Sequence, residues 1–376
     1  MPTRRFRTSV SSLLAACLLA GPAVQSLVAA PPAAEEWEIT PQSEAAIAKG
    51  LAFLAKKQGA AGSWGIGELG IVATGALAFM AAGHTPGDGE YGDTVERALE
   101  FVVAHAKPSG LLNMSTPHHD MYTVGLATFV LGQAYGMTND RRLGQALDKA
   151  LRVIVQTQGP VGSWGYEARP SDGDLSLCVM QAKALRSATD SGFEIPRVTI
   201  EKAIGRVQSM YLPAHGVKNQ GETKLREGPG QFTYSGGGGF TLAMAAAGVV
   251  CIQEFGQYDD WRIAKSMEPI LAALAKIKPP DAPTPNGVLP CGDAYTLNYV
   301  GQALYQVGGQ GWKDHYANLR DALVKSQRAD GAWVGGRLDG VGSEVYGTAV
   351  AVFVLSIPYR YLPILQEAKV GVLGAR

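Results

Sequence analysis

Charged residues, cysteines and long apolar runs are all scarce in this chain of 376 residues. Lysine plus arginine number 33, as do aspartate plus glutamate, and charged residues make up only 18% of the chain. A chain without a basic surplus has few groups to neutralise phosphates, which argues against nucleic acid as a partner. Four cysteines are too few to predict a disulfide framework. No segment beyond the N-terminal region is long and apolar enough for a membrane helix, so we predict no transmembrane span.

Glycine and apolar residues are abundant instead. The chain has 47 glycines, and 46% of its residues are apolar. This composition predicts many buried helices joined by tight turns rather than disorder. The length alone suggests two or three domains, but one repeat architecture can occupy the whole span.

The first 30 residues have the pattern of a secretory signal peptide. Three arginines precede an apolar run at 10–20 that is too short to span a bilayer, and a small-residue cleavage site ends at Ala30. We therefore expect an exported protein, periplasmic or extracellular. Two alternatives stay open: a bacterial lipoprotein box ending at Cys17, which would give lipid anchoring, and a twin-arginine signal at Arg4 and Arg5.

The rest of the chain divides by its repeat pattern. We predict a flexible linker at 31–42, a region of six helical hairpin repeats at 43–366 and a C-terminal tail at 367–376.

One motif occurs three times: a glutamine, three residues, a glycine, a small residue and a tryptophan. Its copies run from Gln58 to Trp64, from Gln158 to Trp164 and from Gln327 to Trp333. An amphipathic helix precedes each copy, and a helix rich in glycine, alanine and valine follows it. Weaker copies fill the gaps and give a mean period of about 54 residues, which is typical of a repeat fold.

The chemistry of this motif suits a corner between two helices. The glutamine amide can donate to free carbonyls at a helix C-terminus or bridge to the next repeat. The glycine permits the left-handed conformation that ends the helix. The tryptophan covers a large apolar area and can donate its indole N–H. We therefore interpret these glutamines and tryptophans as structural.

Six hairpins predict an all-α fold, an (α/α)6 toroid of about twelve helices in an inner and an outer ring. The second helix of each pair is predicted to lie inside, because small residues such as those at 70–76 and 241–248 let helices crowd around an axis. The first helices carry the charges that suit a solvated outer layer.

The repeats resemble those of the prenyltransferase and squalene oxidase repeat family, and squalene-hopene cyclases in particular. Terpenoid cyclases and protein prenyltransferases share this alpha-alpha toroid. The resemblance runs from about Ser43 to Leu365 and implies an apolar central cavity. It is specific for the fold and weak for the activity.

Class II cyclases protonate an alkene with an Asp-x-Asp-Asp motif, in which one carboxyl group stays protonated beside others. The nearest match is Asp172 and Asp174, at the start of an inner helix, with Leu175 in place of the last carboxylate. Asp172 and Asp174 are therefore the candidate catalytic residues. Asp174 also suits the N-cap of the helix that follows it.

Protein prenyltransferases hold a catalytic zinc ion with Asp, Cys and His at inner-helix ends. Cys291 and Asp293 resemble that region in exchanged order, and Gly347 stands where the resemblance places the histidine. A zinc site needs about three protein ligands, so this set is incomplete. We expect no metal and no other cofactor, and the thioester-forming Cys-Gly-Glu-Gln sequence is absent as well.

Further polar and aromatic residues open the predicted inner helices. If these helix starts share one rim, they line the mouth of a pocket. The rim candidates are His119, Asp120, Tyr122, Cys291, Asp293, Tyr295, Glu344 and Tyr346.

Three functions fit these observations. The first is a binding protein that holds an apolar isoprenoid or lipid in the cavity, or a protein at the toroid mouth. The second is a terpenoid cyclase-like or prenyltransferase-like enzyme that uses the rim carboxylates. The third is a structural module of the cell envelope. The missing last aspartate and the missing zinc histidine favour the first.

Overall fold

The computed structural model describes residues 34–65, 67–114, 119–213, 222–237, 239–336 and 340–366. The predicted signal peptide with Cys17, and the tail 367–376, lie outside the described residues. The described residues belong to one compact unit.

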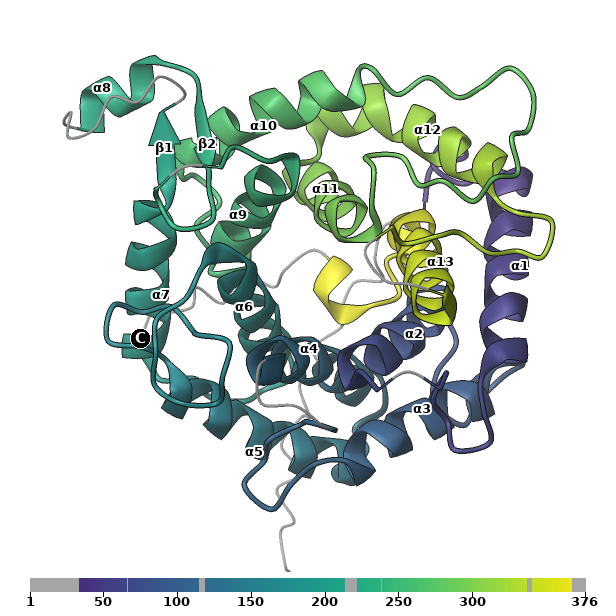
Figure 1. Cartoon of the computed structure of the whole chain (residues 1–376), viewed down its shortest axis with the longest axis horizontal. Helices are drawn as coiled ribbons and strands as arrows, with labels where there is room; N and C mark the ends of the chain where they lie inside the picture. Colours follow the sequence, from purple (N-terminus) through teal and green to yellow (C-terminus); the bar gives the residue numbers. More distant parts are fainter. Residues whose placement is uncertain are drawn as a thin grey trace, which may run out of the picture. The chain divides into compact units, whose positions relative to one another are not determined.

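Six helices form the outer ring of this unit (Figure 1). They are amphipathic: α5, for example, buries Leu143, Leu147, Leu151 and Ile154 and directs its charges outward. The outer helices are α1 (Pro41–Lys57), α3 (Gly92–Ala104), α5 (Arg141–Thr157), α7 (Arg197–Ser209), α10 (Trp261–Leu274) and α12 (Gly309–Ser326).

Six further helices form the inner ring. They are α2 (Leu69–Ala81), α4 (Asp120–Thr138), α6 (Leu175–Asp190), α9 (Leu242–Glu254), α11 (Ala294–Val307) and α13 (Gly340–Ser356). All 13 residues of α2 are buried, as expected for a helix that is apolar all round. The architecture is the predicted toroid of paired inner and outer helices.

Neighbouring inner helices run in the same direction. Tyr122 of α4 donates to Ser176 of α6, and Gln133 of α4 donates to Ser187 of α6; each pair is 54 residues apart in the sequence. This separation equals the predicted repeat period. The starts of the inner helices therefore lie at one end of the ring.

The repeated motif builds the corner between an outer and an inner helix. Gln158 Nε2 donates to Gly162 O at 3.0 Å and to Thr199 O of the next outer helix at 2.9 Å. The indole of Trp164 donates to Ile154 O, ten residues back, at 2.7 Å. The motifs at Gln58 and Gln327 repeat both interactions, with Thr94 and Ala46 as the acceptors in the next outer helix.

The ring closes between the last and first repeats. Gln327 donates from the end of α12 to Ala46 O of α1 at 2.9 Å. The buried Glu38 accepts from the indole of Trp312 at 2.6 Å and from Arg360 at 3.4 Å. The sequence predicted a flexible linker at 31–42. Glu38, in this segment, takes part in the closure because it offers a buried acceptor to two residues far along the chain.

The fourth repeat departs from the all-helical prediction. Between α7 and α9 the chain forms a short antiparallel pair, β1 (Tyr211–Pro213) and β2 (Gly230–Phe232), and a short helix, α8 (Glu222–Glu227). Phe232 stands in place of the motif tryptophan. It packs so close to Gly248 of α9 that a Cβ on that glycine would lie 2.2 Å from its ring.

The C-terminal segment covers the end of the ring where the inner helices finish. It holds two short 3-10 helices, η2 (Ile357–Tyr359) and η3 (Pro363–Leu365), and lies at the centre of the ring in Figure 1. Ile364 N donates to Gln133 at 3.0 Å, and Tyr305 donates to Leu365 O at 2.7 Å. No helix of the described residues is long and apolar enough to cross a membrane.

Candidate functional site

The inner helices enclose a lumen onto which a few of their side chains keep a small accessible surface. On α2 the residues Ile71, Thr74 and Leu77 keep 8%, 6% and 4% of their surface exposed, whereas Val72 and Ala73 keep none. Positions spaced by three residues lie on one face of a helix, so this face points into the lumen.

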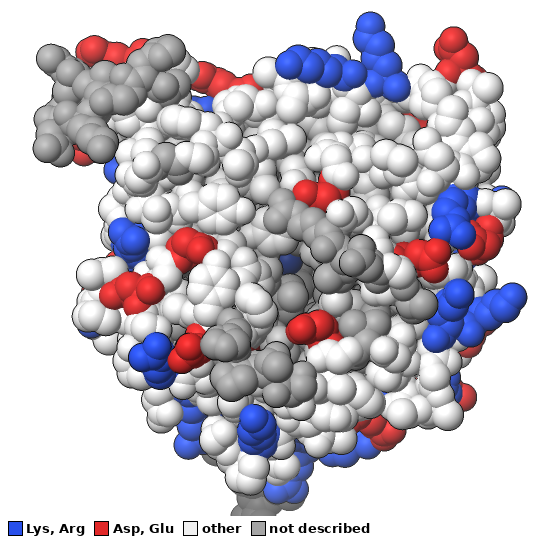
Figure 2. All heavy atoms as spheres, viewed as in Figure 1, with Lys and Arg blue, Asp and Glu red and all other residues white. Residues whose placement is uncertain are grey.

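The same pattern continues on α6, where Met180 and Lys183 each keep 3% exposed. Figure 2 shows a hollow at the centre of the face on which the corners lead into the inner helices, with a basic group visible in its depth. The lumen is therefore open at this end and covered at the other by the C-terminal segment.

Six tyrosines surround the open end of the lumen, and we call them the tyrosine girdle. Its members are Tyr122 of α4, Tyr166 before α6, Tyr234 before α9, Tyr295 and Tyr299 of α11, and Tyr346 of α13. The ring centroids of Tyr122 and Tyr166 are 5.7 Å apart, and those of Tyr295 and Tyr299 are 4.9 Å apart.

The girdle residues are close enough to affect one another electrostatically. Burial raises the pKa of Tyr295 well above its ordinary value, and the phenols of Tyr299, Tyr122, Tyr346 and Tyr234 raise it further. These side chains come from four repeats that are distant in the sequence. The girdle therefore joins different repeats into one surface.

Two hydrogen bonds tie the girdle to the start of α6. Tyr166 donates to Asp174 Oδ2 at 2.8 Å, and Tyr122 donates to Ser176. Burial, and then the hydrogen bond to Asp174, raise the pKa of Tyr166 to about 12, and burial also raises the pKa of Tyr122. Both phenols therefore remain protonated, as hydrogen-bond donors, at neutral pH.

The two candidate catalytic aspartates have local partners. Asp172 accepts from the backbone of Val161 at 3.2 Å and from the Ser163 hydroxyl at 3.0 Å, and so braces the corner at Trp164. Asp174 is the N-cap of α6 and accepts from Ser176 N at 2.9 Å. Of the two, Asp174 touches the girdle, through Tyr166.

Asp174→Ala is expected to lower the free energy of unfolding by about 1 kcal/mol, because it removes the N-cap acceptor of α6. Asp174→Asn keeps a side-chain oxygen that can cap the helix and should cost clearly less. Urea unfolding of both variants measures the difference. Equal losses would show that Asp174 contributes through its charge rather than through capping.

His119, Asp120 and Tyr122 lie together at the start of α4. His119 is exposed, and its ring centroid lies 6.3 Å from that of Tyr122 and 5.9 Å from that of Tyr166. Asp120 is buried and accepts from Asn113. Burial raises the pKa of the Asp120 carboxyl, and the negative charge of Glu167 adds to the rise.

The fifth and sixth repeats place their rim candidates differently. Asp293 is the N-cap of α11 and accepts from Thr296 N at 2.8 Å. Glu344 forms an ion pair with Arg328 at 2.7 Å, toward the corner that follows α12. Tyr295 and Tyr346 belong to the girdle.

The region around Cys291 and Gly347, which resembles the zinc site of protein prenyltransferases, is poorly suited to a metal ion. Burial, and then the charge of Asp293, raise the pKa of the Cys291 thiol to about 12, which disfavours the thiolate that binds metal. Gly347 lies where a Cβ would be 2.5 Å from Gly335 N, so an imidazole has no room there. Within the described ranges, no three His, Cys, Asp or Glu side chains gather as metal ligands.

Sequence reasoning missed three girdle residues and one buried lysine. Tyr166 and Tyr234 each follow the aromatic residue of their corner by two positions, and Tyr299 lies one turn after Tyr295. That spacing could have identified them. Lys183 is the one lysine on the six inner helices as described, which could have drawn attention to it.

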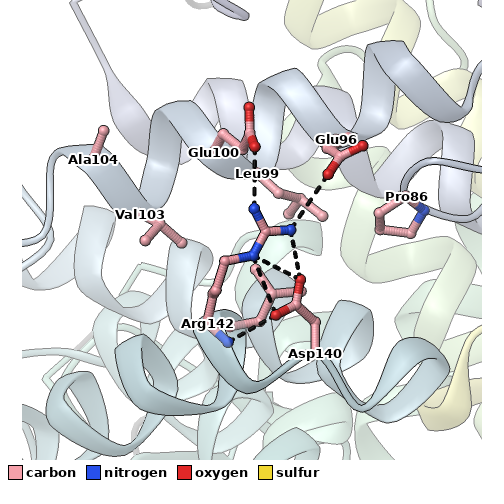
Figure 3. Close-up of a pocket in the computed structure, with 9 residues that line it drawn as sticks. Pro86, Glu96, Leu99, Glu100, Val103, Ala104, Asp140 and Arg142 are labelled. Atoms are coloured by element: carbon pink, nitrogen blue, oxygen red, sulfur yellow. Dashed lines mark hydrogen bonds and ion pairs between the residues drawn. The ribbon is translucent and has the colours of Figure 1, made fainter.

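A separate groove of about 260 Å³ lies on the outer surface between α3 and α5 (Figure 3). Arg142 at its centre contacts Asp140 at 2.8 Å, Glu100 at 3.2 Å and Glu96 at 3.3 Å. The guanidinium donors therefore already have partners, and we assign no function to the groove.

Similarity to known proteins is visible in the fold and not in the sequence. No protein-family model matches the chain, and no curated protein matches it in sequence. Several solved structures are similar. A variant of the type II terpene cyclase MstE from Scytonema, in complex with its substrate geranylgeranyl dihydroxybenzoate, matches with a TM-score of 0.53 and 14% identity, over 85% of this chain and 98% of that chain.

Two other solved structures are as similar. The GH76A alpha-1,6-mannanase from Salegentibacter sp. HEL1_6 matches with a TM-score of 0.55 and 10% identity, over 84% of this chain and 98% of that chain. A protein from Actinoplanes matches with a TM-score of 0.54 and 14% identity, over 85% and 99%. The predicted fold class is therefore confirmed. Because the same ring serves an isoprenoid cyclase and a mannanase, the function must be argued from the lumen.

Proposed function

We propose that this protein binds an apolar, isoprenoid-like or lipid-like molecule in the lumen of its ring. The observation that carries the proposal is the stripe of inner-helix side chains that keep a small accessible surface on the lumen. It consists of apolar side chains such as Ile71, Leu77 and Met180, below a mouth of six tyrosines. Binding sites for apolar molecules combine such walls with a few polar groups that fix orientation.

The tyrosine girdle supports this proposal. Aromatic rings offer a large apolar area, and their hydroxyl groups can hydrogen-bond to a polar end group. A sugar would need many more polar partners along the wall than the stripe of α2 and α6 supplies. The signal-peptide pattern of residues 1–30 supports the further proposal that binding takes place outside the cytoplasm.

Two measurements test the binding. Organic extraction of the purified full-length protein, followed by mass spectrometry, is expected to recover a bound apolar molecule. Calorimetric titration with the isoprenoid alcohol farnesol is expected to show saturable binding, which Met180→Trp weakens at least roughly tenfold, or about 1.4 kcal/mol, because the indole fills the lumen.

Val198→Trp is the matched control, because Val198 lies on the outer ring with 56% of its surface exposed. It should leave the affinity unchanged. Saturable binding of a mannose oligosaccharide in place of farnesol, or equal affinity of the Met180→Trp variant and the unmodified protein, would refute the proposal.

One observation favours a second candidate, an enzyme that uses acid–base chemistry at the rim. Asp120 is a buried carboxyl group beside the girdle, and burial raises its pKa, as a general acid requires. Asp120→Asn would then abolish turnover of a bound isoprenoid and leave its binding intact. Turnover that survives this substitution eliminates Asp120 as the acid.

A further inference from the structure

Lys183 lies deep in the lumen and forms no hydrogen bond within the described part of the chain. It is the ninth residue of α6 and lies one turn below Met180 on the same stripe. A rise of 1.5 Å per residue puts it roughly 12 Å below the helix start. Its side chain is 3% exposed, and its amine forms no hydrogen bond to any residue that the structure describes.

The amine of Lys183 points across the ring. Nζ lies 4.0 Å from the ring centroid of Phe129 on the neighbouring α4 and 5.7 Å from that of Phe353 on α13. Helix α13 packs between α2 and α11 and faces α6 across the lumen (Figure 1). The amine therefore extends toward the axis of the lumen and not between adjacent helices.

The amine also retains contact with the space of the lumen. Several described side-chain nitrogen and oxygen atoms are sealed from solvent and have no hydrogen-bond partner. Lys183 Nζ is not one of them. Since the amine has no hydrogen bond to a described residue, it would belong to that set if it were sealed, so it keeps some accessible surface. A molecule in the lumen can reach it.

One carboxyl group is near enough to interact electrostatically with the amine. Glu254 at the end of α9 interacts with Lys183 electrostatically, and Gln306 of α11 donates to it at 2.8 Å. Helix α4 beside α6 and helix α13 across the lumen contribute the uncharged rings of Phe129 and Phe353. The other charges, Arg186 and Asp190, lie farther along α6 and pair with each other at 2.8 Å.

Burial favours the reactive form of each group. It lowers the pKa of Lys183 and raises the pKa of Glu254, and in both cases the partner's charge only partly offsets the shift. At a given pH, a larger fraction of the Lys183 side chains is therefore in the neutral amine form than for an exposed lysine. A lysine desolvated in an apolar pocket is a nucleophile toward carbonyl compounds.

We propose that Lys183 forms an imine with an apolar aldehyde or ketone that enters the lumen with its carbonyl group first. This inference rests on the proposed binding of an apolar molecule. The carbonyl group would meet the amine about 12 Å below the rim, and the apolar chain would fill the space up to the tyrosine girdle.

The reaction is balanced without any oxidant or reductant. The nitrogen lone pair attacks the carbonyl carbon, a C–N bond forms, and a proton moves from nitrogen to the former carbonyl oxygen. The protonated carboxyl of Glu254 gives its proton to the resulting hydroxyl group, which leaves as water as the C=N bond forms. The product is a protonated imine beside the Glu254 carboxylate, and loss of that proton back to Glu254 gives the neutral imine.

Reductive trapping tests the proposal. The full-length protein is incubated with farnesal, an isoprenoid aldehyde, and cyanoborohydride near neutral pH, and the adduct is located by peptide mass spectrometry. We expect occupancy at Lys183 at least roughly tenfold above that of an exposed lysine such as Lys202, because the buried amine is less protonated. Lys183→Arg and Met180→Trp should each abolish the selective adduct, and excess farnesol should compete with it.

The outcomes separate this inference from the proposed function. Adducts spread over surface lysines, with none selective for Lys183, would overturn the imine. If farnesol still binds and Met180→Trp still weakens it, the proposed function stands without the imine. Loss of both farnesol binding and the selective adduct would refute both.

Discussion

Replacing Trp164 with alanine is expected to lower the free energy of unfolding by about 3–5 kcal/mol. The indole is fully buried, and its N–H donates to Ile154 O at 2.7 Å. Alanine would leave a cavity between α5 and α6 and an unpaired carbonyl at the end of α5. Equilibrium unfolding in urea, followed by circular dichroism, measures the loss.

Two further variants sharpen this prediction. Trp164→Phe keeps most of the apolar contact but removes the donor, so about 2 kcal/mol of the loss should remain. Val161→Ala changes an exposed side chain in the same corner and should stay within about 0.5 kcal/mol of the unmodified protein. A loss for Trp164→Ala no larger than that of Val161→Ala would show that the corner contributes little to stability.

Removing one member of the Lys183–Glu254 pair is expected to destabilise the protein, whereas removing both costs much less. Lys183→Met or Glu254→Gln alone should cost at most about 3 kcal/mol, because each removes the opposite charge that partly offsets the burial of its partner. The double variant carries no charge at position 183 or 254. The amide oxygen that replaces the Glu254 carboxylate can still accept a hydrogen bond from Gln306. Denaturant unfolding of all four proteins gives the coupling free energy.

The pH dependence of stability supplies an independent test of this pair. The raised pKa of Glu254 means that the folded protein keeps a proton that the unfolded chain has lost. This contribution is complete below the ordinary glutamate pKa and is lost as the pH rises through the raised value. The lowered pKa of Lys183 acts in the next window: stability rises with pH between the lowered value and the ordinary lysine pKa.

Glu254→Gln should therefore remove the loss of stability in the first window, and Lys183→Met should remove the gain in the second. Additive losses in the double variant, or pH profiles that the substitutions do not change, would contradict the predicted coupling.

The fold could be read from the sequence because its signals are local and repeated. The spacing from Gln158 to Trp164 recurs, and the hydrogen bonds of that corner join residues within ten positions or in the next outer helix. The pair β1 and β2 was not predicted. It lies in the fourth repeat, where Phe232 replaces the tryptophan and the connection to the inner helix is longer.

The candidate site could be read only in part. Residues at helix starts, such as Tyr122, Tyr295 and Tyr346, were predicted to share a rim, because six parallel inner helices must begin at the same end. The surroundings of each carboxyl group could not be predicted. Asp172 braces a corner and Glu344 pairs with Arg328, and these contacts depend on how the loops fold over the rim.

The sequence by itself determined the class of this protein: paired helices with small residues inside, joined by tryptophan corners. The physical reason is that period, composition and glycine positions are properties of the chain and need no knowledge of distant contacts. Only the tertiary structure decided which side chains meet. Closing the ring brought Gln327 to Ala46, and it brought Lys183 of α6 to Phe353 of α13, which lies 170 residues away in the sequence. No local pattern encodes such pairs, because they depend on the curvature summed over six repeats.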